Sequence, residues 1–232
     1  MMYLSKEDIE NIGDSVLEDY ATQNDIRNQI PIDIERFARG YLGLNIEYQK
    51  LSDNGKILGL TSYMGVVLEL SFSDGSSFLS VPEDTILLDT QFTILRNQRR
   101  KRFTIAHECA HQILARIEES INQDQYYNNS THISCRRLYT SEDWIEWQAN
   151  SLGAVLLIPR LALFAELNRD IEPFRPTIYG DILNTLDYKK VKYLSDKFGV
   201  SISAMKIRLK ELGCMIVKLE EEFIDPLDIT YE

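Results

Sequence analysis

The spacing of hydrophobic residues predicts that the chain begins with helices. Apolar side chains recur at three- and four-residue intervals after Ser5 and again after Asp33, and both residues are of types that commonly cap a helix. Gly43 provides a stop for the second run. We therefore expect two helices before residue 45.

A strand-rich stretch follows between about residues 45 and 90. Val66–Ser71 and Ser77–Val81 flank an Asp74-Gly75 pair, and Asp-Gly is among the strongest signals for a hairpin turn. Thr85–Asp89 has the β-branched and apolar character of one more strand. The pattern predicts a small sheet that contains an antiparallel hairpin.

The second half of the chain returns to helical periodicity. One helix is expected from about residue 93 to residue 117, and another from Ser141 to Ile158, where Pro159 would end it. The polar residues 118–141 between them predict a long loop. After a proline-interrupted linker, the pattern is helical until a short strand-like segment at residues 214–219.

Charge and composition narrow the function classes. The 232-residue chain has a net charge of −11, which argues against a protein whose whole surface binds nucleic acid or anionic lipid. Its three cysteines are too few for a disulfide scaffold. The first residues lack a signal-peptide pattern, and no apolar stretch reaches the ~20 residues of a membrane helix. We expect a soluble, cytoplasmic protein with no membrane partner.

Two of the three histidines lie in the sequence His107-Glu108-Cys109-Ala110-His111, which has the HExxH pattern. On a helix, residues four apart share one face, so both imidazoles can point at one metal ion. Zn²⁺ takes imidazole and carboxylate ligands and keeps an open position for water in catalytic sites. Glu108 could then accept a proton from that water as it attacks a carbonyl group. The alternative is a helix that carries the two histidines by coincidence.

A third protein ligand is needed to complete a catalytic zinc site. Glu146 is the candidate from a second helix, although a solvated helix carboxylate is the alternative for it. Small residues recur on the helical face that Glu146 occupies; they are Ala149, Asn150 and Gly153. Such residues would let two helices approach closely enough to share one ion. His132 and Cys135 are weaker candidates, because they fall in the predicted loop.

Two segments of the chain carry a family resemblance. Residues 102–111 read RFTIAHECAH, and residues 146–159 read EWQANSLGAVLLIP. These segments resemble the RRFTLAHELGH signature and the ExEANxFAxxLLMP helix of the ImmA/IrrE family of zinc metallopeptidases. The order of helix, hairpin and strand upstream also fits, so the resemblance covers roughly residues 8–215.

The resemblance implies a zincin-like fold with Zn²⁺ as the cofactor. It assigns the zinc ligands to His107, His111 and Glu146 and the catalytic base to Glu108. Asn150 would lie nearby in a supporting role. Cys109 departs from the family pattern, and its position about 200° around the helix from His107 favours a small buried hydrophobic residue over a redox-sensing thiol.

The group that would stabilise the developing oxyanion stays open. The candidates are side chains of the predicted loop, namely Tyr126, Tyr127, His132 and Tyr139.

Residues 189–210 form a basic segment in an acidic chain, with seven basic residues against one acidic residue. Their apolar positions, with Ser195 and Gly199 between them, resemble a helix-turn-helix. In that interpretation the contacts to phosphates or to a partner would come from Lys206, Arg208 and Lys210. The favoured alternative is a helix pair that closes the peptidase core, with a solvated basic face. A third possibility is a surface that docks an acidic patch of the substrate.

We predict an α+β fold with two parts. A mostly helical, zincin-like metallopeptidase core with a small hairpin-containing sheet spans residues 1–170, and a C-terminal helical region with the helix-turn-helix-like pair spans residues 171–232. The predicted activity is zinc-dependent endoproteolysis. The resemblance implies that the substrate is a helix-turn-helix transcriptional repressor of a bacterial or phage mobile element or stress-response locus, whose cleavage relieves repression. The alternative is a DNA-binding or repressor-binding regulator that does not cut; the oligomeric state and the scissile bond stay open.

Overall fold

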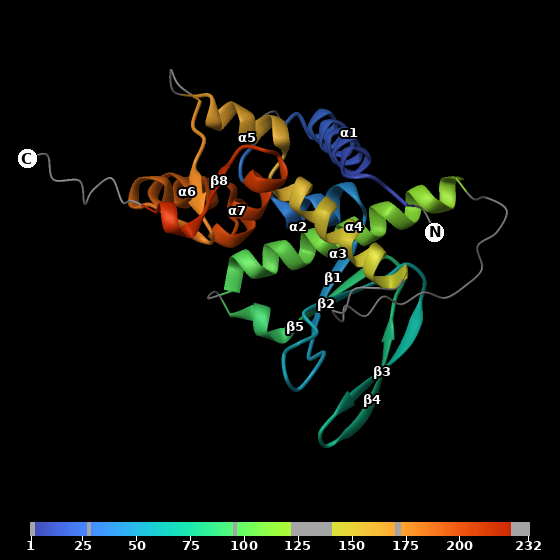
Figure 1. Cartoon of the computed structure of the whole chain (residues 1–232). Coiled ribbons are helices and arrows are strands. Elements are labelled where there is room, and N and C mark those ends of the chain that lie inside the picture. Colours follow the sequence, from blue (N-terminus) through green and yellow to red (C-terminus); the bar gives the residue numbers. More distant parts are fainter. Residues whose placement is uncertain (1–2, 27–28, 95–96, 122–140, 170–172, 224–232) are drawn as a thin grey trace, which may run out of the picture. The chain divides into compact units, whose positions relative to one another are not determined.

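The computed structural model describes residues 3–26, 29–94, 97–121, 141–169 and 173–223 (Figure 1). The chain divides into two compact units, the first containing residues 1–27 and 32–156 and the second residues 28–31 and 157–232. Helices and small sheets occur together in both units, which confirms the α+β class. The predicted boundary at residue 170, between the peptidase core and the C-terminal helical region, stays a prediction.

The first unit begins with the two predicted helical segments. Helix α1 (Lys6–Asn24) starts after Ser5, whose hydroxyl accepts a backbone hydrogen bond in a capping box. Asp33 caps α2 (Ile34–Arg36), which continues as the π-helical turn η1 (Phe37–Tyr41). Both N-terminal signals in the sequence therefore mark the residues at which helices begin.

The strands of the first unit form two small sheets. In the first, β1 (Asn45–Gln49) pairs in parallel with β5 (Thr85–Asp89), and β2 (Gly59–Ser62) pairs with the other edge of β5 in antiparallel fashion. The predicted hairpin consists of β3 (Val66–Phe72) and β4 (Gly75–Val81), which pair only with each other among the described strands. The three-stranded sheet is thus mixed, and the hairpin extends beside it (Figure 1).

One face of the hairpin contributes to the core of the first unit. Alternate residues of β3 are buried or half-buried, ending at Leu70, and Val81 of β4 packs into a cluster with Leu51, Leu60 and Leu87. Phe78 lies on the opposite face and is exposed. This alternation of buried and exposed positions has the period of two that is typical of a β-strand with one covered face.

Two helices follow the sheet. A short 3-10 turn, η2 (Thr90–Thr93), precedes α3 (Gln98–Ile121), and α4 (Ser141–Leu157) has nearly the predicted bounds. Helix α3 starts later than predicted, and residues 90–93 instead form η2, which is capped by the side chain of Asp89. It also ends later, because the glutamates that were assigned to the loop for their polarity are good helix formers. The rest of the predicted loop, residues 122–140, lies outside the described residues.

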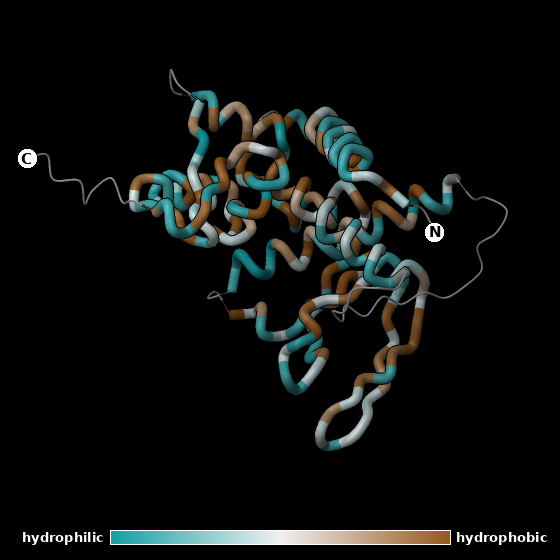
Figure 2. The backbone as a smooth tube through the Cα atoms, in the orientation of Figure 1, coloured by the Kyte–Doolittle hydropathy of each residue, from teal (hydrophilic) through white to brown (hydrophobic). Residues whose placement is uncertain are grey.

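The middle of α3 is the most enclosed segment of the first unit. Its residues are buried at every position from Thr104 to Ile113, whereas its first turns are hydrophilic (Figure 2). Two basic residues in the first turns of α3 attach the helix to residues 32–35. Lys101 pairs with Glu35 at 2.7 Å, and Arg102 donates to the carbonyl of Ile32 at 2.9 Å. The middle of α3 is thus buried on all sides, and α3 packs against β2 and β5.

The second unit consists of short helices around a three-stranded sheet. Its elements are α5 (Arg160–Leu167), β6 (Thr177–Tyr179), β7 (Ile182–Leu183), α6 (Thr185–Phe198), α7 (Ile202–Glu211), β8 (Ile216–Lys218) and the 3-10 turn η4 (Glu220–Glu222). The strand order is β7-β6-β8, with β6 and β8 parallel. The sequence pattern predicts β8 and the helix pair but not β6 and β7, because strands of three and two residues are too short to show a period.

Helices α6 and α7 form the predicted pair. The cap of α6 is Asn184, Gly199 ends that helix, and Ser201 caps α7. Between the helices, Phe198 and Met205 are fully buried. Among the described residues, no single helix has the length and apolar character of a membrane span, and the bent pair Glu142–Leu157 and Arg160–Leu167 meets that criterion by length and composition only.

Candidate metal centre

The two histidines of the HExxH pattern lie one turn apart in the buried middle of α3. Their Nε2 atoms approach to 3.0 Å, and the two rings are nearly perpendicular. Both side chains are buried, with exposures of 7% for His107 and 3% for His111. Both imidazoles therefore face the same point, as the four-residue spacing predicts.

The third group of the cluster comes from α4. Glu146 places Oε2 at 3.4 Å from the Nε2 atom of His107 and Oε1 at 3.3 Å from that of His111. These three residues form a group of ligand atoms that could hold a metal ion. Glu146 is thus not a solvated carboxylate, since both of its oxygens face the imidazoles.

The spacing of these atoms fits a zinc ion. A tetrahedral ion with bonds of about 2.0–2.1 Å has neighbouring ligand atoms about 3.3 Å apart. The two Nε2 atoms lie 3.0 Å apart, and each lies 3.3–3.4 Å from a different oxygen of Glu146, so one ligand atom from each residue can reach a common ion. Two imidazoles and one carboxylate are also the donor set of catalytic sites that keep a fourth position open. In both spacing and chemistry, the residues present fit Zn²⁺.

The close approach of α4 to α3 depends on small residues. A Cβ atom at Gly153 would lie 3.1 Å from the backbone nitrogen of His107 and 3.2 Å from its Cα, so only glycine fits at this separation without displacement. Ala149 is fully buried on the same helix. The small-residue face inferred from the sequence is thus where α4 contacts α3.

The electrostatics of the cluster follow from burial and mutual contact. Burial favours the neutral form of Glu146, but hydrogen bonding with His107 and His111 outweighs it and holds the pKa of the carboxyl well below its usual range. For His107, burial lowers the pKa, but Glu146, Glu108 and Asn150 together raise it. The carboxyl groups of Glu146 and Glu108 therefore favour a positive charge at the point where the two imidazoles meet.

Glu108 lies beside the cluster in a different environment. Its side chain is buried, and this burial raises the pKa of the carboxyl to about 7, opposed by His107 and reinforced by Glu146. A carboxyl with a pKa near neutrality can both accept and return a proton, as a general acid–base requires. The backbone of β2 passes next to it, because a Cβ atom at Gly59 would lie 2.9 Å from Oε1 of Glu108.

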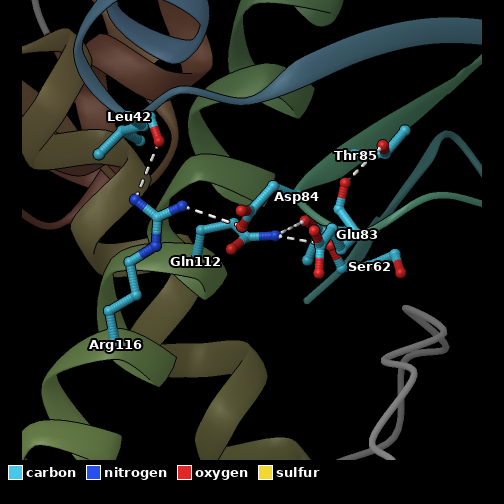
Figure 3. A network of polar contacts seen from close by, with 8 residues as sticks. Leu42, Ser62, Glu83, Asp84, Thr85, Gln112 and Arg116 are labelled. Atoms are coloured by element: carbon cyan, nitrogen blue, oxygen red, sulfur yellow. Dashed lines mark hydrogen bonds and ion pairs between the residues drawn. The ribbon is translucent and has the colours of Figure 1, made fainter. Parts of the chain in front are cut away.

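A polar contact that the sequence analysis missed joins the centre to the sheet. Gln112 follows His111 and is buried; its Nε2 donates to Thr61 Oγ1 at 2.7 Å and to the carbonyl of Ser62 at 3.1 Å (Figure 3). One turn further, Arg116 donates to the carbonyl of Leu42 and to Asp84. No local signal marks Gln112, since its partners are about fifty residues away in the sequence.

The remaining predicted residues near the centre have different outcomes. Asn150 is largely exposed, yet its side chain interacts with His107 and contributes to the pKa described above. Cys109 is fully buried, and burial raises the pKa of its thiol, as expected for a packing residue. Five further candidates lie outside the described residues: Tyr126, Tyr127, His132, Cys135 and Tyr139.

The three basic residues predicted to contact phosphates or a partner do not share one environment. Arg208 is 2% exposed, and its Nε donates to the carbonyl of Ile158 at 3.0 Å. That guanidinium therefore has almost no surface to offer, and the proposed contact does not fit its position, because charge counting cannot tell the inner face of a helix from the outer one. Lys206 donates to the carbonyl of Asp181, and Lys210 is exposed.

Comparison with protein families matches residues 94–210 to the IrrE N-terminal-like domain, a family of peptidases. The matched segment contains both helices of the candidate metal centre and continues through α6 into α7. No curated protein matches the chain significantly. The match covers half of the chain, and with the His-His-Glu cluster on α3 and α4 it establishes that this protein belongs to the ImmA/IrrE family of metallopeptidases.

Proposed function

We propose that this protein is a zinc-dependent endopeptidase with His107, His111 and Glu146 as metal ligands and Glu108 as catalytic base. The observation that carries the proposal is the convergence of two imidazoles and a carboxylate on one point, with a second carboxyl buried beside them. Zinc is favoured over harder ions because imidazole nitrogen provides two of the three ligands.

In the proposed peptide hydrolysis, the bound metal and Glu108 have separate roles. The bound metal would polarise the scissile carbonyl and make a water molecule more acidic. Glu108 accepts the proton of the attacking water and returns it to the leaving amide nitrogen, so no net proton is consumed. Its pKa of about 7 suits both transfers. The buried surroundings of α3 limit competing solvent and strengthen these electrostatic interactions.

The proposed substrate is a helix-turn-helix transcriptional repressor in the cytoplasm, encoded on a mobile element or in a stress-response locus. Support for this substrate comes from the family to which the chain belongs, whose resemblance implies repressor cleavage, and from the net charge of −11, which disfavours wholesale binding to DNA. Cleavage would remove the repressor from its operator.

A first experiment separates metal binding from catalysis. The purified chain is expected to bind about one zinc ion, and Glu108→Gln should keep that ion while cleavage falls by about 10²–10⁴-fold, the range for loss of a general acid–base. Glu119→Gln, an exposed position on the same helix, is the matched control and should behave as wild type. Failure to bind zinc in titration would end the metallopeptidase proposal.

A second experiment tests the substrate. The zinc-loaded chain is incubated with a helix-turn-helix repressor encoded beside its gene, and mass spectrometry looks for new chain ends that are absent with Glu108→Gln. A stable complex with an intact partner would instead favour the alternative of a repressor-binding regulator that does not cut.

The DNA-binding alternative is tested by retardation of duplex DNA at low salt. The burial of Arg208 and the carbonyl contact of Lys206 speak against it, so we expect no salt-dependent shift. A shift that Lys206→Glu together with Lys210→Glu removes would revive it.

A further inference from the structure

The proposed catalytic base and the two histidines lie on different faces of α3. Successive residues are about 100° apart around a helix, so Glu108 does not share the face that the histidines turn toward Glu146. Glu108 lies instead in a row with Thr104, one turn earlier, and Gln112, one turn later. All three side chains of this row are buried. Their contacts therefore decide where the carboxyl group of Glu108 lies.

Strand β2 lies against this row of α3. A Cβ atom at Gly59 would lie 2.7 Å from Thr104 Cγ2 and 2.9 Å from Glu108 Oε1, so the start of the strand contacts the first two members of the row. Further along the strand, Thr61 Oγ1 accepts a hydrogen bond from Gln112 Nε2 at 2.7 Å. The strand is thus attached to the helix on both sides of the carboxyl group.

Strand β2 is also held on its opposite edge, by β5. Gly59 pairs with Leu88 in the antiparallel ladder, and the backbone N–H of Asp89 donates to the carbonyl of Leu58 at 2.9 Å. A side chain at position 59 could therefore not be accommodated by a retreat of the strand unless these hydrogen bonds were broken. The side chains of α3 would have to move instead.

Of the two side chains that meet position 59, that of Glu108 is the easier to displace. Thr104 is β-branched, and its hydroxyl donates to the carbonyl of Arg100 at 3.1 Å, which favours its present rotamer. The carboxyl group of Glu108 lies at the end of a longer side chain with more rotatable bonds. A methyl group at position 59 would consequently push this carboxyl group away from the strand.

We propose that Gly59 is a positioning residue for the catalytic base, because the absence of a side chain at this position lets the carboxyl group of Glu108 lie against β2. The proposal rests on the proposed function. Gly59 takes part in no proton transfer itself; it acts through the location of the group that does. A misplacement of about 1 Å can reduce the rate of an enzyme by about 10²-fold, whereas the metal ligands on the other face of α3 would keep their geometry.

Gly59→Ala in the full-length chain tests this role, since alanine adds a single methyl group. Gly65→Ala is the matched control, because a Cβ atom there would lie 3.9 Å from the carbonyl oxygen of Val81, an ordinary van der Waals distance. Three quantities are measured: the zinc affinity, the affinity of the zinc-loaded chain for acetohydroxamate, and the urea unfolding curve. Acetohydroxamate is a small metal ligand whose hydroxyl proton requires an acceptor beside the ion, so it reports on the carboxyl group of Glu108.

We expect Gly59→Ala to keep the zinc affinity of wild type and to bind acetohydroxamate about 10-fold more weakly, the loss that accompanies a broken charge-assisted hydrogen bond. In a Glu108→Gln background, Gly59→Ala should cause no further loss of acetohydroxamate affinity, because the carboxylate through which residue 59 acts is absent. On any peptide that the wild type cleaves, kcat should fall by up to about 10²-fold with little change in KM. Gly65→Ala should match wild type throughout.

A second variant covers the case in which the urea curve shows that Gly59→Ala alone does not fold. The same measurements are then made on Gly59→Ala combined with Thr104→Ser, with Thr104→Ser alone as the reference. Serine keeps the hydroxyl that binds the carbonyl of Arg100 and removes the methyl group nearest to the new Cβ atom, while Glu108 Oε1 remains in its way. If the combined variant does not fold either, residue 59 has a structural role and the proposal is overturned.

Equal acetohydroxamate affinity in Gly59→Ala and wild type would overturn the role of Gly59 and leave the proposed peptidase intact. A parallel loss of zinc affinity would also overturn it, as would a further loss in the Glu108→Gln background, because either result would indicate a general distortion of α3. If wild type itself fails to bind zinc or, once loaded, acetohydroxamate, the proposed function fails first, and the role of Gly59 fails with it.

Discussion

The polar and charged side chains of the two units are arranged in opposite ways. In the first unit, His107, His111 and Glu146 turn their polar atoms toward one shared point. In the second unit, several cations of the basic helix pair contact separate partners, such as the carbonyl of Ile158 for Arg208 and the carboxylate of Asp196 for Lys192. Metal-ligating side chains that point at one place can bind an ion there, whereas cations that each contact a different group hold helices together.

The more conspicuous charge pattern in the sequence is therefore the one whose side chains do not converge on a common point. The basic segment stands out in the composition of an acidic chain, but its contacts are those of a packed helix pair. The metal cluster has only three residues, yet its members can be accommodated together only around a cation or a shared proton. Convergence, and not charge density, distinguishes the two regions.

The largest expected effect is the loss of metal from the convergent cluster. Zinc at a thousandfold excess over its Kd should raise the free energy of unfolding by about 4 kcal/mol, and EDTA should remove that increment. Glu146→Ala should lower zinc affinity by more than about 100-fold, beyond the range for outer-shell changes, so that EDTA hardly alters its urea unfolding curve.

Glu142→Ala is the control for this measurement, because Glu142 is exposed on the same helix. It should keep the full response to EDTA. If Glu146→Ala retained that response, the convergence of its carboxylate on the histidines would have no bearing on metal binding.

The next largest effect concerns the separately satisfied cations. Arg208→Met would leave the carbonyl of Ile158 without that donor in a buried position, which should lower the free energy of unfolding by about 2–3 kcal/mol. Lys210→Met, exposed on the same helix, should change it by no more than about 0.5 kcal/mol. Urea denaturation measures both. A neutral Arg208→Met variant would show that this guanidinium is not a structural element.

A smaller effect is expected where the helices of the metal centre meet. Gly153→Ala introduces a methyl group 3.1 Å from the backbone of His107 and should cost about 1–2 kcal/mol of stability through overpacking. Displacement of α4 should also weaken zinc binding, because Glu146 moves with it. Gly40→Ala is the control, since a Cβ atom there would lie 4.0 Å from Arg36 Cγ, an ordinary van der Waals distance. Unchanged zinc affinity in Gly153→Ala would contradict the coupling between helix spacing and the metal centre.

The smallest effect belongs to an exposed ion pair. Lys192 contacts Asp196 at 2.7 Å one turn along α6, and both side chains are about half exposed. Lys192→Met should therefore change stability by at most about 0.5 kcal/mol. A change as large as that of Arg208→Met, measured under the same conditions, would remove the distinction between surface and buried cations in this helix pair.

The metal centre could be predicted because its signals are local. The four-residue spacing of the histidines is a property of one helix, and Gly153 lies at a helical interval from Glu146. The hairpin and β5 could be predicted equally well, the hairpin from its Asp74-Gly75 turn and β5 from its run of β-branched and apolar residues.

What escaped prediction depends on contacts between distant segments. Gln112 gains its significance from the position of β2 on α3, which no interval along the chain encodes. Arg208 was misjudged for the same reason, because its burial follows from packing around Ile158. The strands β6 and β7 are too short to show any period and are held by pairing with each other and with β8.

The division of the ligands between α3 and α4 has a consequence during synthesis. His107 and His111 leave the ribosome before Glu146, which follows 35 residues after the second histidine. A nascent chain therefore carries the proposed catalytic base and two of the proposed ligands before the third exists, and it cannot complete the cluster until α4 has emerged and packed on α3. The order of translation thus delays the assembly of the proposed protease until its own core is formed.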